Sequence, residues 1–415
     1  MKNKTISVIG LGYTGLPILI ELLKKNIYTV GFDIDREKIN KIHKAEKYIK
    51  NINFRFIKKK LKNNMVTSNF KFVSNLDILI LCLPTPLKKN KIPDMKYINN
   101  TIKSIKNYLK VGQAISLEST SYPGTTKELL YEKLKNKFDI GKNFFIIYSP
   151  ERIDPGNKNF KLNSIPKVVS GITPECQKIA KSFYSLIFKK IIQAKETEIA
   201  EFSKLLENIF RSVNVGLVNE MKLLAEKMKL DIHKIIKVAS SKPFGYMPFY
   251  PGPGLGGHCI PIDPFYLTWK AKKIGFKTKF IKTSGIINKE VTENIIKKIK
   301  KLSKNKKILI IGLSYKKDVD DLRESASLKI MKDLKKSRFK VDYHDNYFRK
   351  LKHNRSFFQN TESVKLSREN LKKYDLVLIS TNHSYLNFNH IFKHSKLILD
   401  SRNVYKFYSP KIVQC

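Results

Sequence analysis

The feature that most constrains this chain is a glycine-rich turn placed between a short apolar run and a helix-like segment. Residues 5–9 are strand-like, the turn Gly10-Leu11-Gly12-Tyr13-Thr14-Gly15 follows, residues 16–25 have helical character, and residues 28–33 are strand-like again. Glycines also collect in ordinary loops, so these three alone would be weak evidence. The order of strand, turn, helix and strand makes the pattern specific, and it predicts a dinucleotide-binding unit.

Each residue type in this turn has a physical reason to be there. Gly10 permits the tight turn, Gly12 admits a pyrophosphate close to the backbone, and Gly15 lets the helix pack on the strand. The first amides of the helix, beside Tyr13 and Thr14, would face the phosphates. We therefore expect these five residues to bind the cofactor.

A carboxylate at the end of the second strand selects between the two nicotinamide dinucleotides. Asp33 lies 23 residues after Gly10, where it would accept hydrogen bonds from the adenosine ribose and repel a 2′-phosphate. This arrangement favours NAD over NADP. Arg36 is expected beside the same ribose and leaves the phosphorylated cofactor open as an alternative.

Three more apolar runs, residues 79–83, 114–117 and 144–148, each end in a polar turn. Such runs are typical of a parallel sheet buried on both faces, whose ligands lie outside the carboxyl ends of the strands. The turns therefore line one predicted cleft with Pro84, Thr85, Pro86, Ser119, Thr120 and Glu151. Cys82 lies inside its strand and is expected to be a core residue.

A long helix is predicted in the middle of the chain. Residues 196–229 carry apolar side chains at mixed three- and four-residue spacing with no proline, over some 34 residues. A helix of that length is expected to connect domains or to support a subunit interface. Lys204 and Asn208 are four residues apart and project from the same face. On a lysine-rich chain, a solvated lysine and asparagine are the alternative to a functional pair.

A loop rich in glycine and proline, residues 250–264, presents Cys259, with Asp263 four residues later. Its glycines can adopt positive φ and let a ligand approach the backbone closely. A cysteine held in this way beside a carboxylate is a candidate nucleophile, and a buried structural cysteine is the alternative. The loop alone does not decide between them.

The last third of the chain returns to an alternation of strands and helices. After helix-like residues 265–273 and 289–301, strand-like runs follow at residues 307–315, 340–343, 376–379 and 397–400. No complete second glycine fingerprint is present, so we predict no second dinucleotide there. Basic residues at the turns suit a nucleotide diphosphate instead, namely Lys316, Lys317, Arg323 and Arg402. For Arg323 the alternative is an ion pair with Glu324.

The net charge of +46 does not by itself indicate a nucleic-acid partner. Lysine and arginine total 81 against 35 acidic residues, yet the lysines are spread through almost every segment. We therefore expect a solvated basic surface with weak, non-specific affinity for polyanions. The four cysteines show no metal-binding spacing, and no apolar run approaches the roughly 20 residues of a membrane span. A cytoplasmic protein with reduced thiols, no metal and no membrane contact is expected.

Seven segments, in order, resemble the UDP-glucose/GDP-mannose dehydrogenase family over nearly the whole chain. They are residues 10–15, 84–86, 118–126, 149–152, 204–208, 254–263 and 320–325. The amino-acid sequence of residues 118–126 and 256–264 is most similar to that of the bacterial UDP-N-acetylhexosamine branch. The resemblance implies that two NAD oxidise the sugar C6 hydroxyl of a UDP-sugar substrate, expected to be UDP-N-acetylglucosamine, to a carboxylate for surface polysaccharide synthesis.

The resemblance also implies the roles of the central residues. Cys259 matches the family nucleophile, which would pass through a thiohemiacetal and a thioester. Lys204 and Asn208 match the pair that stabilises oxyanions, and Asp263 matches the carboxylate that acts with the lysine and a water.

Further matches complete the predicted site. Thr120 and Glu151 match residues that position this water and assist hydrolysis. A second glutamate, which some relatives carry four residues later, is replaced here by Pro155, with Asp154 beside it. The nucleotide sugar is expected to contact Glu151, Arg152, Lys204, Asn208, Arg211, Tyr250, Gly254, Gly256, Gly257, Lys316, Arg323 and Arg402, with the glycines making room for the sugar. The cofactor is expected to contact Pro84, Thr85, Thr120 and Lys317 as well.

The implied fold is α/β, with two Rossmann-like doubly wound parallel-sheet domains joined by a central helical domain that contains one long helix. We expect an NAD-binding domain at residues 1–195, a central dimerisation domain with the lysine and the cysteine loop at 196–303, and a nucleotide-sugar domain at 304–415. A homodimer or larger homo-oligomer is implied. The same reaction on UDP-N-acetylgalactosamine, UDP-N-acetylmannosamine or UDP-glucose stays open, and a basic polyanion-binding protein on a dehydrogenase fold is the alternative from another class.

Overall fold

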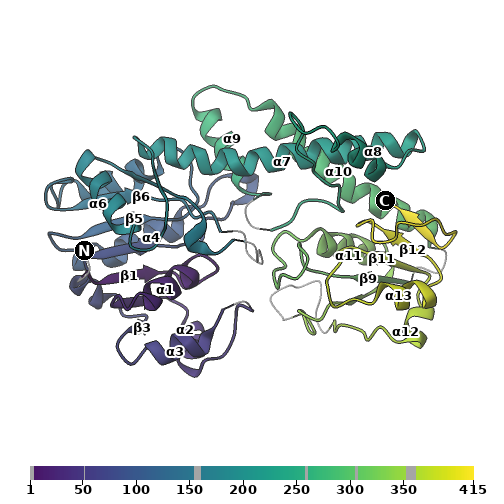
Figure 1. Ribbon diagram of the computed structural model, residues 1–415, viewed down its shortest axis with the longest axis horizontal. Helices are drawn as coiled ribbons and strands as arrows, with labels where there is room; N and C mark the ends of the chain where they lie inside the picture. The colour runs from purple at the N-terminus through teal and green to yellow at the C-terminus, as the bar shows by residue number, and fades with distance from the viewer. Residues whose placement is uncertain (1–3, 51, 154–159, 258–259, 304–306, 352–360) are drawn as a thin grey trace. The chain divides into compact units, whose positions relative to one another are not determined.

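The computed structural model describes residues 4–50, 52–153, 160–257, 260–303, 307–351 and 361–415. The chain divides into two compact units, each with one main sheet (Figure 1). Unit 1 comprises Met1–Glu207 and Ile262–Lys277, and unit 2 comprises Asn208–Pro261 and Thr278–Cys415. Nucleophile candidate Cys259 and its neighbour His258 lie outside the described residues, as do Asp154 and Pro155.

Unit 1 is organised around an eight-stranded sheet with the order β3-β2-β1-β4-β5-β6-β7-β8. Its strands are β1 (Ile6–Ile9), β2 (Thr29–Phe32), β3 (Met65–Thr67), β4 (Ile78–Leu81), β5 (Ala114–Leu117), β6 (Phe145–Tyr148), β7 (Lys167–Gly171) and β8 (Ile191–Gln193). Every neighbouring pair is parallel except β6 and β7. The chain changes direction across the sheet between β1 and β4, which creates a switch point where ligands bind in folds of this kind.

The helices of unit 1 pack their apolar faces on this sheet. They are α1 (Gly15–Lys24), α2 (Arg36–Lys44), α3 (Phe54–Lys60), α4 (Lys96–Ile105), α5 (Glu132–Leu134), α6 (Pro174–Tyr184) and α9 (Asp263–Lys273), with short turns η1 (Phe70–Asn75), η2 (Lys89–Lys91), η3 (Lys106–Tyr108), η4 (Lys127–Tyr131) and η5 (Leu162–Ser164). Local capping fixes where several of them begin. Asp35 accepts hydrogen bonds from the first amides of α2, and Thr173 does the same for α6.

Unit 2 contains a five-stranded, fully parallel sheet with the order β10-β9-β11-β12-β13. The strands are β9 (Lys307–Ile311), β10 (Lys340–His344), β11 (Leu376–Ile379), β12 (Ile398–Asp400) and β13 (Ile412–Gln414). Its helices are α8 (Ile232–Ala239), α10 (Lys279–Leu302), α11 (Ala326–Lys336), α12 (Arg368–Lys372) and α13 (Phe388–His394). The buried runs of β9 and β11 form its centre, and the switch point lies between these two strands.

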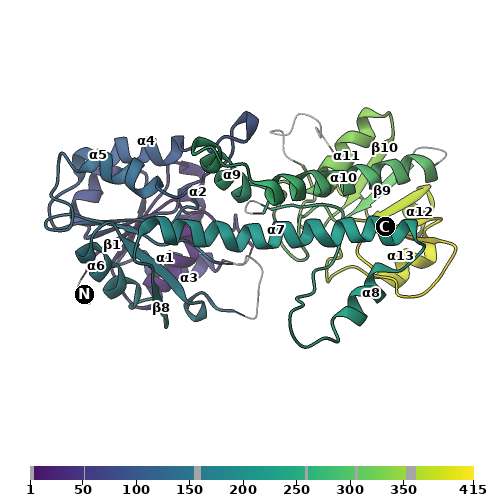
Figure 2. The ribbon, with the colours of Figure 1, turned by 90° about the horizontal axis from the view of Figure 1, so that it is seen from above.

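Helix α7 (Thr197–Lys227) is one uninterrupted helix of 31 residues that begins in unit 1 and ends in unit 2 (Figure 2). Its side chains separate into two faces. Glu201, Lys204, Asn208 and Asn219 are buried, whereas a stripe of large apolar residues is exposed. The buried face also contains apolar residues such as Leu205 and Val218, so α7 is apolar on both faces, which is unusual for a helix that only covers a core.

The predicted fold class is confirmed by the two doubly wound sheets and the long helix. Cys82 follows the last residue of β4 rather than lying within the strand, yet it is buried in the core as expected. Strands β3, β7, β8 and β13 were not predicted. Of these, β3, β8 and β13 have three residues each and lie at a sheet edge, whereas β7 (Lys167–Gly171) is a five-residue interior strand whose pattern was not recognised. Among the described residues, no helix is both long enough and apolar enough to cross a membrane.

Candidate active site

The glycine turn of unit 1 has the geometry that close approach of a ligand requires. Gly10 has a φ of +98°, and a side chain there would run into the carbonyl oxygen of Cys82. A side chain at Gly15 would meet the carbonyl oxygen of Gly10. Around Gly12, by contrast, nothing lies within 4 Å of where a Cβ would stand. Two of the glycines are thus required by the fold, and the third leaves open space beside the backbone.

The other parts of this cradle also fit a dinucleotide. Thr14 precedes α1 without a side-chain cap, so the first amides of the helix can bind phosphate. The Asp33 carboxylate is 7% exposed and accepts hydrogen bonds of 2.9 Å from the N–H groups of Leu11 and Asp35. Lys38 lies 3.4 Å from Asp33, whereas Arg36 is exposed at the start of α2. These residues fit a bound NAD.

The turns after β4, β5 and β6 meet at the carboxyl edge of the sheet, as predicted. The N–H of Leu83 donates to the Ser119 hydroxyl, which donates to the Leu83 carbonyl, each at 2.9 Å. Thr85 is buried, Pro84 is exposed and Thr120 is half-buried. This edge therefore carries the Thr120 and Glu151 positions on a rigid frame of adjacent strands.

A buried charge cluster lies directly behind Glu151. Lys167, the first residue of β7, pairs with the Glu118 carboxylate and lies 3.7 Å from the carboxylate of Glu151. Tyr184 donates a further hydrogen bond to Glu118. Burial raises the pKa of Glu118 to about 7, against the attraction of Lys167. Burial opposes the charge of Lys167, but the two carboxylates raise its pKa above the ordinary value.

Helix α7 presents the predicted oxyanion pair from its buried face. Lys204 is 6% exposed and Asn208 is fully buried, one helical turn later. The solvated alternative for these two residues is therefore wrong. Glu201, one turn earlier, accepts hydrogen bonds from the N–H groups of Gly124 and Thr126 at 2.6 and 2.8 Å, which fixes α7 on the turn after β5. Asp263 is 2% exposed at the first position of α9.

Unit 2 holds the described part of the glycine loop firmly. The N–H of Gly252 donates to Asn219 of α7 at 3.2 Å, and Thr292 of α10 donates to the Pro253 carbonyl at 2.8 Å. The N–H of Gly257 donates to the Arg323 carbonyl at 2.9 Å. The sequence analysis did not identify Asn219, Thr292 and Arg323 as partners of this loop. Polar residues at core positions of helices, as Asn219 and Thr292 are, were a signal that could have revealed two of them.

The glycines of this loop make room for a neighbouring side chain rather than leaving the expected open space. A Cβ on Gly256 or Gly257 would collide with Tyr315. One on Gly254 would meet Thr292, and its φ is +140°. The loop therefore owes its glycines to close packing, at Gly256 and Gly257 on Tyr315 of the turn after β9 and at Gly254 on Thr292 of α10.

The predicted arginines of unit 2 have distinct surroundings. Arg402 lies against Gly252, donates to the Ser380 carbonyl at 2.7 Å, and has its pKa lowered to about 10 by burial. Arg211 is exposed and donates to the Asn208 carboxamide oxygen. Arg323 forms a bidentate pair with Asp321. The ion pair expected with Glu324 is therefore formed with Asp321 instead.

Three further predicted residues lie at the surface of unit 2. Tyr250 is 61% exposed and its ring stacks against His233 with 6.4 Å between centroids. Lys316 is half-buried and Lys317 is exposed on the turn after β9. None of the described residues of either unit forms a cluster of three or more His, Cys, Asp or Glu side chains suited to a metal ion.

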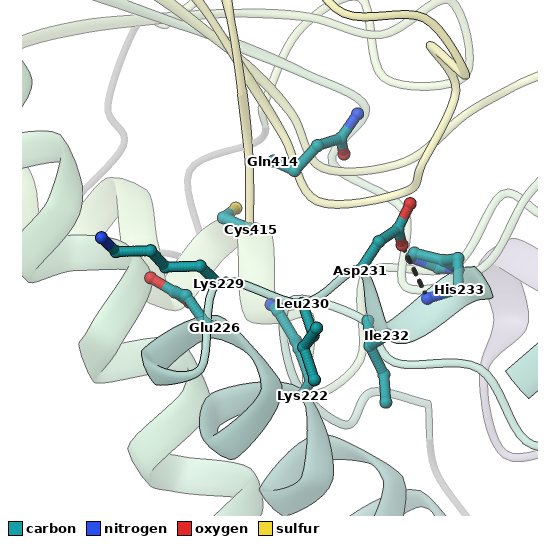
Figure 3. Close-up of a pocket in the computed structure, with 9 residues that line it drawn as sticks. All are labelled: Lys222, Glu226, Lys229, Leu230, Asp231, Ile232, His233, Gln414 and Cys415. Carbon is teal, nitrogen blue, oxygen red and sulfur yellow. Dashed lines mark hydrogen bonds between the residues drawn. The ribbon is translucent and has the colours of Figure 1, made fainter. Parts of the chain in front are cut away.

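A cavity of about 280 Å³ lies in unit 2, where the end of α7, the start of α8 and strand β13 meet (Figure 3). Its lining comprises Lys222, Glu226, Lys229, Leu230, Asp231, Ile232, His233, Gln414 and Cys415. Lys222 is 5% exposed, and burial lowers its pKa. The N–H of His233 donates to the Asp231 carboxylate at 2.8 Å, the bond drawn in Figure 3. None of these residues belongs to the predicted site.

Comparison with known proteins decides the family. Models of three domains of one family match the chain in order: the NAD binding domain over residues 4–188, the central domain over residues 198–290, and the UDP binding domain over residues 309–407. The chain belongs to the UDP-glucose/GDP-mannose dehydrogenase family. The predicted family, NAD cofactor and oxidoreductase class are thereby confirmed.

Individual members of the UDP-glucose/GDP-mannose dehydrogenase family are similar over most of their length. A UDP-N-acetyl-D-glucosamine 6-dehydrogenase of Pseudomonas aeruginosa is 33% identical over 83% of each chain. A UDP-N-acetyl-D-mannosamine dehydrogenase of Methanocaldococcus jannaschii is 33% identical over 97% of this chain and 93% of its own. The solved UDP-D-ManNAc dehydrogenase of Pyrococcus horikoshii is 28% identical with a TM-score of 0.86, covering 99% and 98% of the two chains. The chain is accordingly an NAD-dependent UDP-sugar dehydrogenase of this family.

Proposed function

We propose that this enzyme oxidises the C6 hydroxyl of UDP-N-acetylglucosamine to the uronic acid, with the same reaction on another UDP-N-acetylhexosamine or on UDP-glucose as the alternative. Support comes from the wording of residues 118–126 and 256–264 and from relatives named for the glucosamine substrate. Other relatives are named for the mannosamine and galactosaminuronic compounds. The epimer is thus the part of the proposal that most needs an experiment.

The observation that carries the proposal is the burial of Lys204 and Asn208 on α7. The chain has 81 basic residues, for which exposure to solvent is the ordinary state. Lys204 is buried, with an exposed fraction of 6%. Burying an ammonium is costly unless charge or hydrogen bonds compensate it. A pair of buried donors one turn apart suits an oxyanion that forms during the reaction.

Bound NAD would lie on the turn at Gly10–Gly15 with its ribose at Asp33, and it supplies the acceptor for each hydride. Tyr13, Thr14, Pro84 and Thr85 would complete its surroundings. The chain's own residues then have to move protons and hold charge. That division of labour is the usual one between a cofactor and its protein.

We assign the proton and charge steps as follows. Asp263 and Lys204 hold a water that accepts the C6 hydroxyl proton in the first oxidation. The Cys259 thiolate then adds to the aldehyde carbon, and Lys204 and Asn208 stabilise the oxyanion of the thiohemiacetal. After the second oxidation, a water positioned by Thr120 and Glu151 hydrolyses the thioester.

The nucleotide-sugar contacts are proposed on the charges of unit 2. Arg402 and Arg323 carry guanidinium groups suited to phosphate oxygens, and Lys316 adds a further positive charge on the turn after β9. Arg323 already binds Asp321, so a ligand would have to share or replace that pair. Arg152 pairs with Glu207 at 2.6 Å, so a substrate that contacts Arg152 would also have to share or replace that pair.

We also propose that two copies associate through α7. Its exposed apolar stripe comprises Ile199, Phe202, Leu206, Phe210, Leu217, Met221, Leu224 and Met228, each between 39% and 59% exposed. An apolar groove of about 740 Å³ adjoins it, lined in part by Tyr246, Met247 and Phe249. A stripe of this size on one helix face is typical of an interface between subunits.

A substrate panel tests the reaction and the sugar together. The purified enzyme is given NAD with UDP-N-acetylglucosamine, UDP-N-acetylgalactosamine, UDP-N-acetylmannosamine, UDP-glucose or GDP-mannose, and NADH absorbance is followed. We expect the highest kcat/KM with UDP-N-acetylglucosamine. A preference for another UDP-sugar would correct the substrate, and no NADH with any of them would reject the proposed function.

A further inference from the structure

Lys167 reaches both the backbone and the carboxylate of the segment that carries Glu151. Its ammonium donates to the Pro150 carbonyl at 3.2 Å, lies 3.7 Å from Oε2 of Glu151, and pairs with Glu118. The Lys167 side chain is 3% exposed. A buried lysine with these acceptors is held in one place, and it holds the end of β6 in turn.

The two oxygens of Glu151 are not equivalent. Oε1 accepts hydrogen bonds of 2.6 Å from the N–H groups of Arg152 and Ile153. Oε2 is buried and accepts no hydrogen bond from the described residues, with the Lys167 ammonium as the charge beside it. An unbonded carboxylate oxygen in a buried site is costly unless a water or a ligand group occupies it. Oε2 is therefore the oxygen of this carboxylate that still has the capacity to accept a proton or a hydrogen bond.

We propose that Lys167 is a positioning residue for the hydrolytic half of the reaction: it fixes the Glu151 carboxylate in place, so that this carboxylate takes a proton from the attacking water. This inference rests on the proposed function. In the step, the water oxygen bonds to the thioester carbonyl carbon, one water proton passes to Glu151, the C–S bond breaks, and the sulfur returns to Cys259 as a thiolate.

Among the charged groups around Glu151, Lys167 is the one that can hold its carboxylate in place. The titratable side chains that face the cluster from neighbouring elements are Glu118, Tyr184, Cys82 and Tyr148, and burial raises the pKa of the Tyr148 phenol, which therefore stays neutral. Glu118 and Cys82 would add negative charge or none, and Tyr184 is bound to Glu118. The Arg152 guanidinium is turned to Glu207. Without Lys167, two carboxylates would face each other in a buried site, which favours protonation of one of them.

The test compares Lys167→Met with Lys167→Arg, and uses Lys190→Met as the matched control at an exposed lysine before β8. For Lys167→Met we expect kcat to fall roughly 10- to 100-fold with little change in KM for NAD or sugar. The acidic limb of the kcat profile should move up by about one pH unit or more. Intact-protein mass spectrometry should show a sugar adduct accumulating on the enzyme. Lys167→Arg should restore most of the rate, and Lys190→Met should match the wild type.

If Lys167→Met does not fold, the double variant Lys167→Met/Glu118→Gln leaves one carboxylate fewer without a partner and takes its place. Wild-type kcat, pH profile and adduct level in a folded variant without Lys167 would overturn this inference alone, provided that the wild type releases uronate. A wild type that releases no uronate from any UDP-sugar would overturn the proposed function, and this inference with it.

Discussion

The N–H of Leu11 donates a 2.9 Å hydrogen bond to the buried carboxylate of Asp33. Unit 2 repeats this arrangement, because the N–H of Leu313 donates to the Asp345 carboxylate at 2.7 Å. In each unit, an acid at the end of the second strand fixes the turn after the first. The aspartate that is expected to bind the ribose therefore also holds the phosphate-binding turn in shape.

This double role predicts the effect of Asp33→Asn. The amide keeps the size of the side chain but can accept only one of the two backbone N–H hydrogen bonds, and it lacks the charge that binds the ribose and repels a 2′-phosphate. KM for NAD should therefore rise about tenfold and the preference over NADP should fall. Steady-state kinetics with both cofactors measure this. Asp345→Asn is the matched control and should lower the melting temperature without changing KM for NAD. Equal effects of the two changes would contradict the assignment of Asp33.

The three glycines of the turn should respond differently to alanine. Gly15→Ala forces a Cβ onto the Gly10 carbonyl and should destabilise unit 1 by several kcal/mol. Gly12→Ala meets nothing within 4 Å and should leave the melting temperature nearly unchanged while KM for NAD rises. Thermal melts and NAD kinetics separate the two effects. A Gly12→Ala enzyme with wild-type KM would show that the pyrophosphate lies elsewhere.

The contribution of Glu201 to the stability of the protein should fall as pH rises through the weakly acidic range. Burial raises the pKa of Glu201 to about 7, against hydrogen bonds from Thr126 and Gly124 that favour the ionised form. A glutamate in the unfolded chain titrates near 4.3, so the folded state holds this proton more tightly between about pH 4.5 and 7. The stabilisation is complete below that window and is lost across it, by about 1–3 kcal/mol.

Urea unfolding of the wild type and of Glu201→Gln from pH 4.5 to 7.5 measures this loss. The stability of the wild type relative to that of Glu201→Gln should fall as pH rises across this window. Glu220→Gln, at an exposed position on the same helix, is the control and should keep the wild-type slope. Parallel slopes for wild type and Glu201→Gln would show that Glu201 does not retain its proton.

The exposed stripe of α7 predicts a dimer that charge can break. Leu217 and Leu224 are 52% and 50% exposed, so Leu217→Glu/Leu224→Glu should leave the fold intact but place two carboxylates in the interface. Sedimentation should then show a monomer in place of the dimer. Val111→Glu changes an apolar residue that is 66% exposed in unit 1, and should not alter the assembly. A wild type that sediments as a monomer would contradict the proposal directly.

Sequence reasoning succeeded where local pattern and fold agree. The turn at Gly10–Gly15, the buried runs of both sheets and the extent of α7 all follow from periodicity and turn chemistry, because these are local properties. Lys167 could not be recognised in this way, since its partners Glu118 and Glu151 lie 49 and 16 residues away along the chain. The pairing of β5 with β6 and of β6 with β7 brings these three residues together.

The loop glycines show what composition alone does not predict. Their composition correctly indicated a tight backbone, but it did not reveal what occupies the space beside Gly256 and Gly257. The answer, Tyr315, comes from a turn some 60 residues later. A glycine reports that a side chain would not fit, and the three-dimensional structure has to supply the reason.

The most direct test of the central claim is the number of NADH formed for each sugar consumed. Limiting UDP-N-acetylglucosamine is oxidised to completion by the wild-type enzyme and by Cys259→Ser, with NADH read by absorbance and uronate by mass spectrometry. The wild type should form two NADH and one uronate for each sugar, whereas Cys259→Ser should bind NAD normally but fail to complete the oxidation. One NADH per sugar in the wild type, or unchanged uronate from Cys259→Ser, would contradict covalent four-electron oxidation at this cysteine.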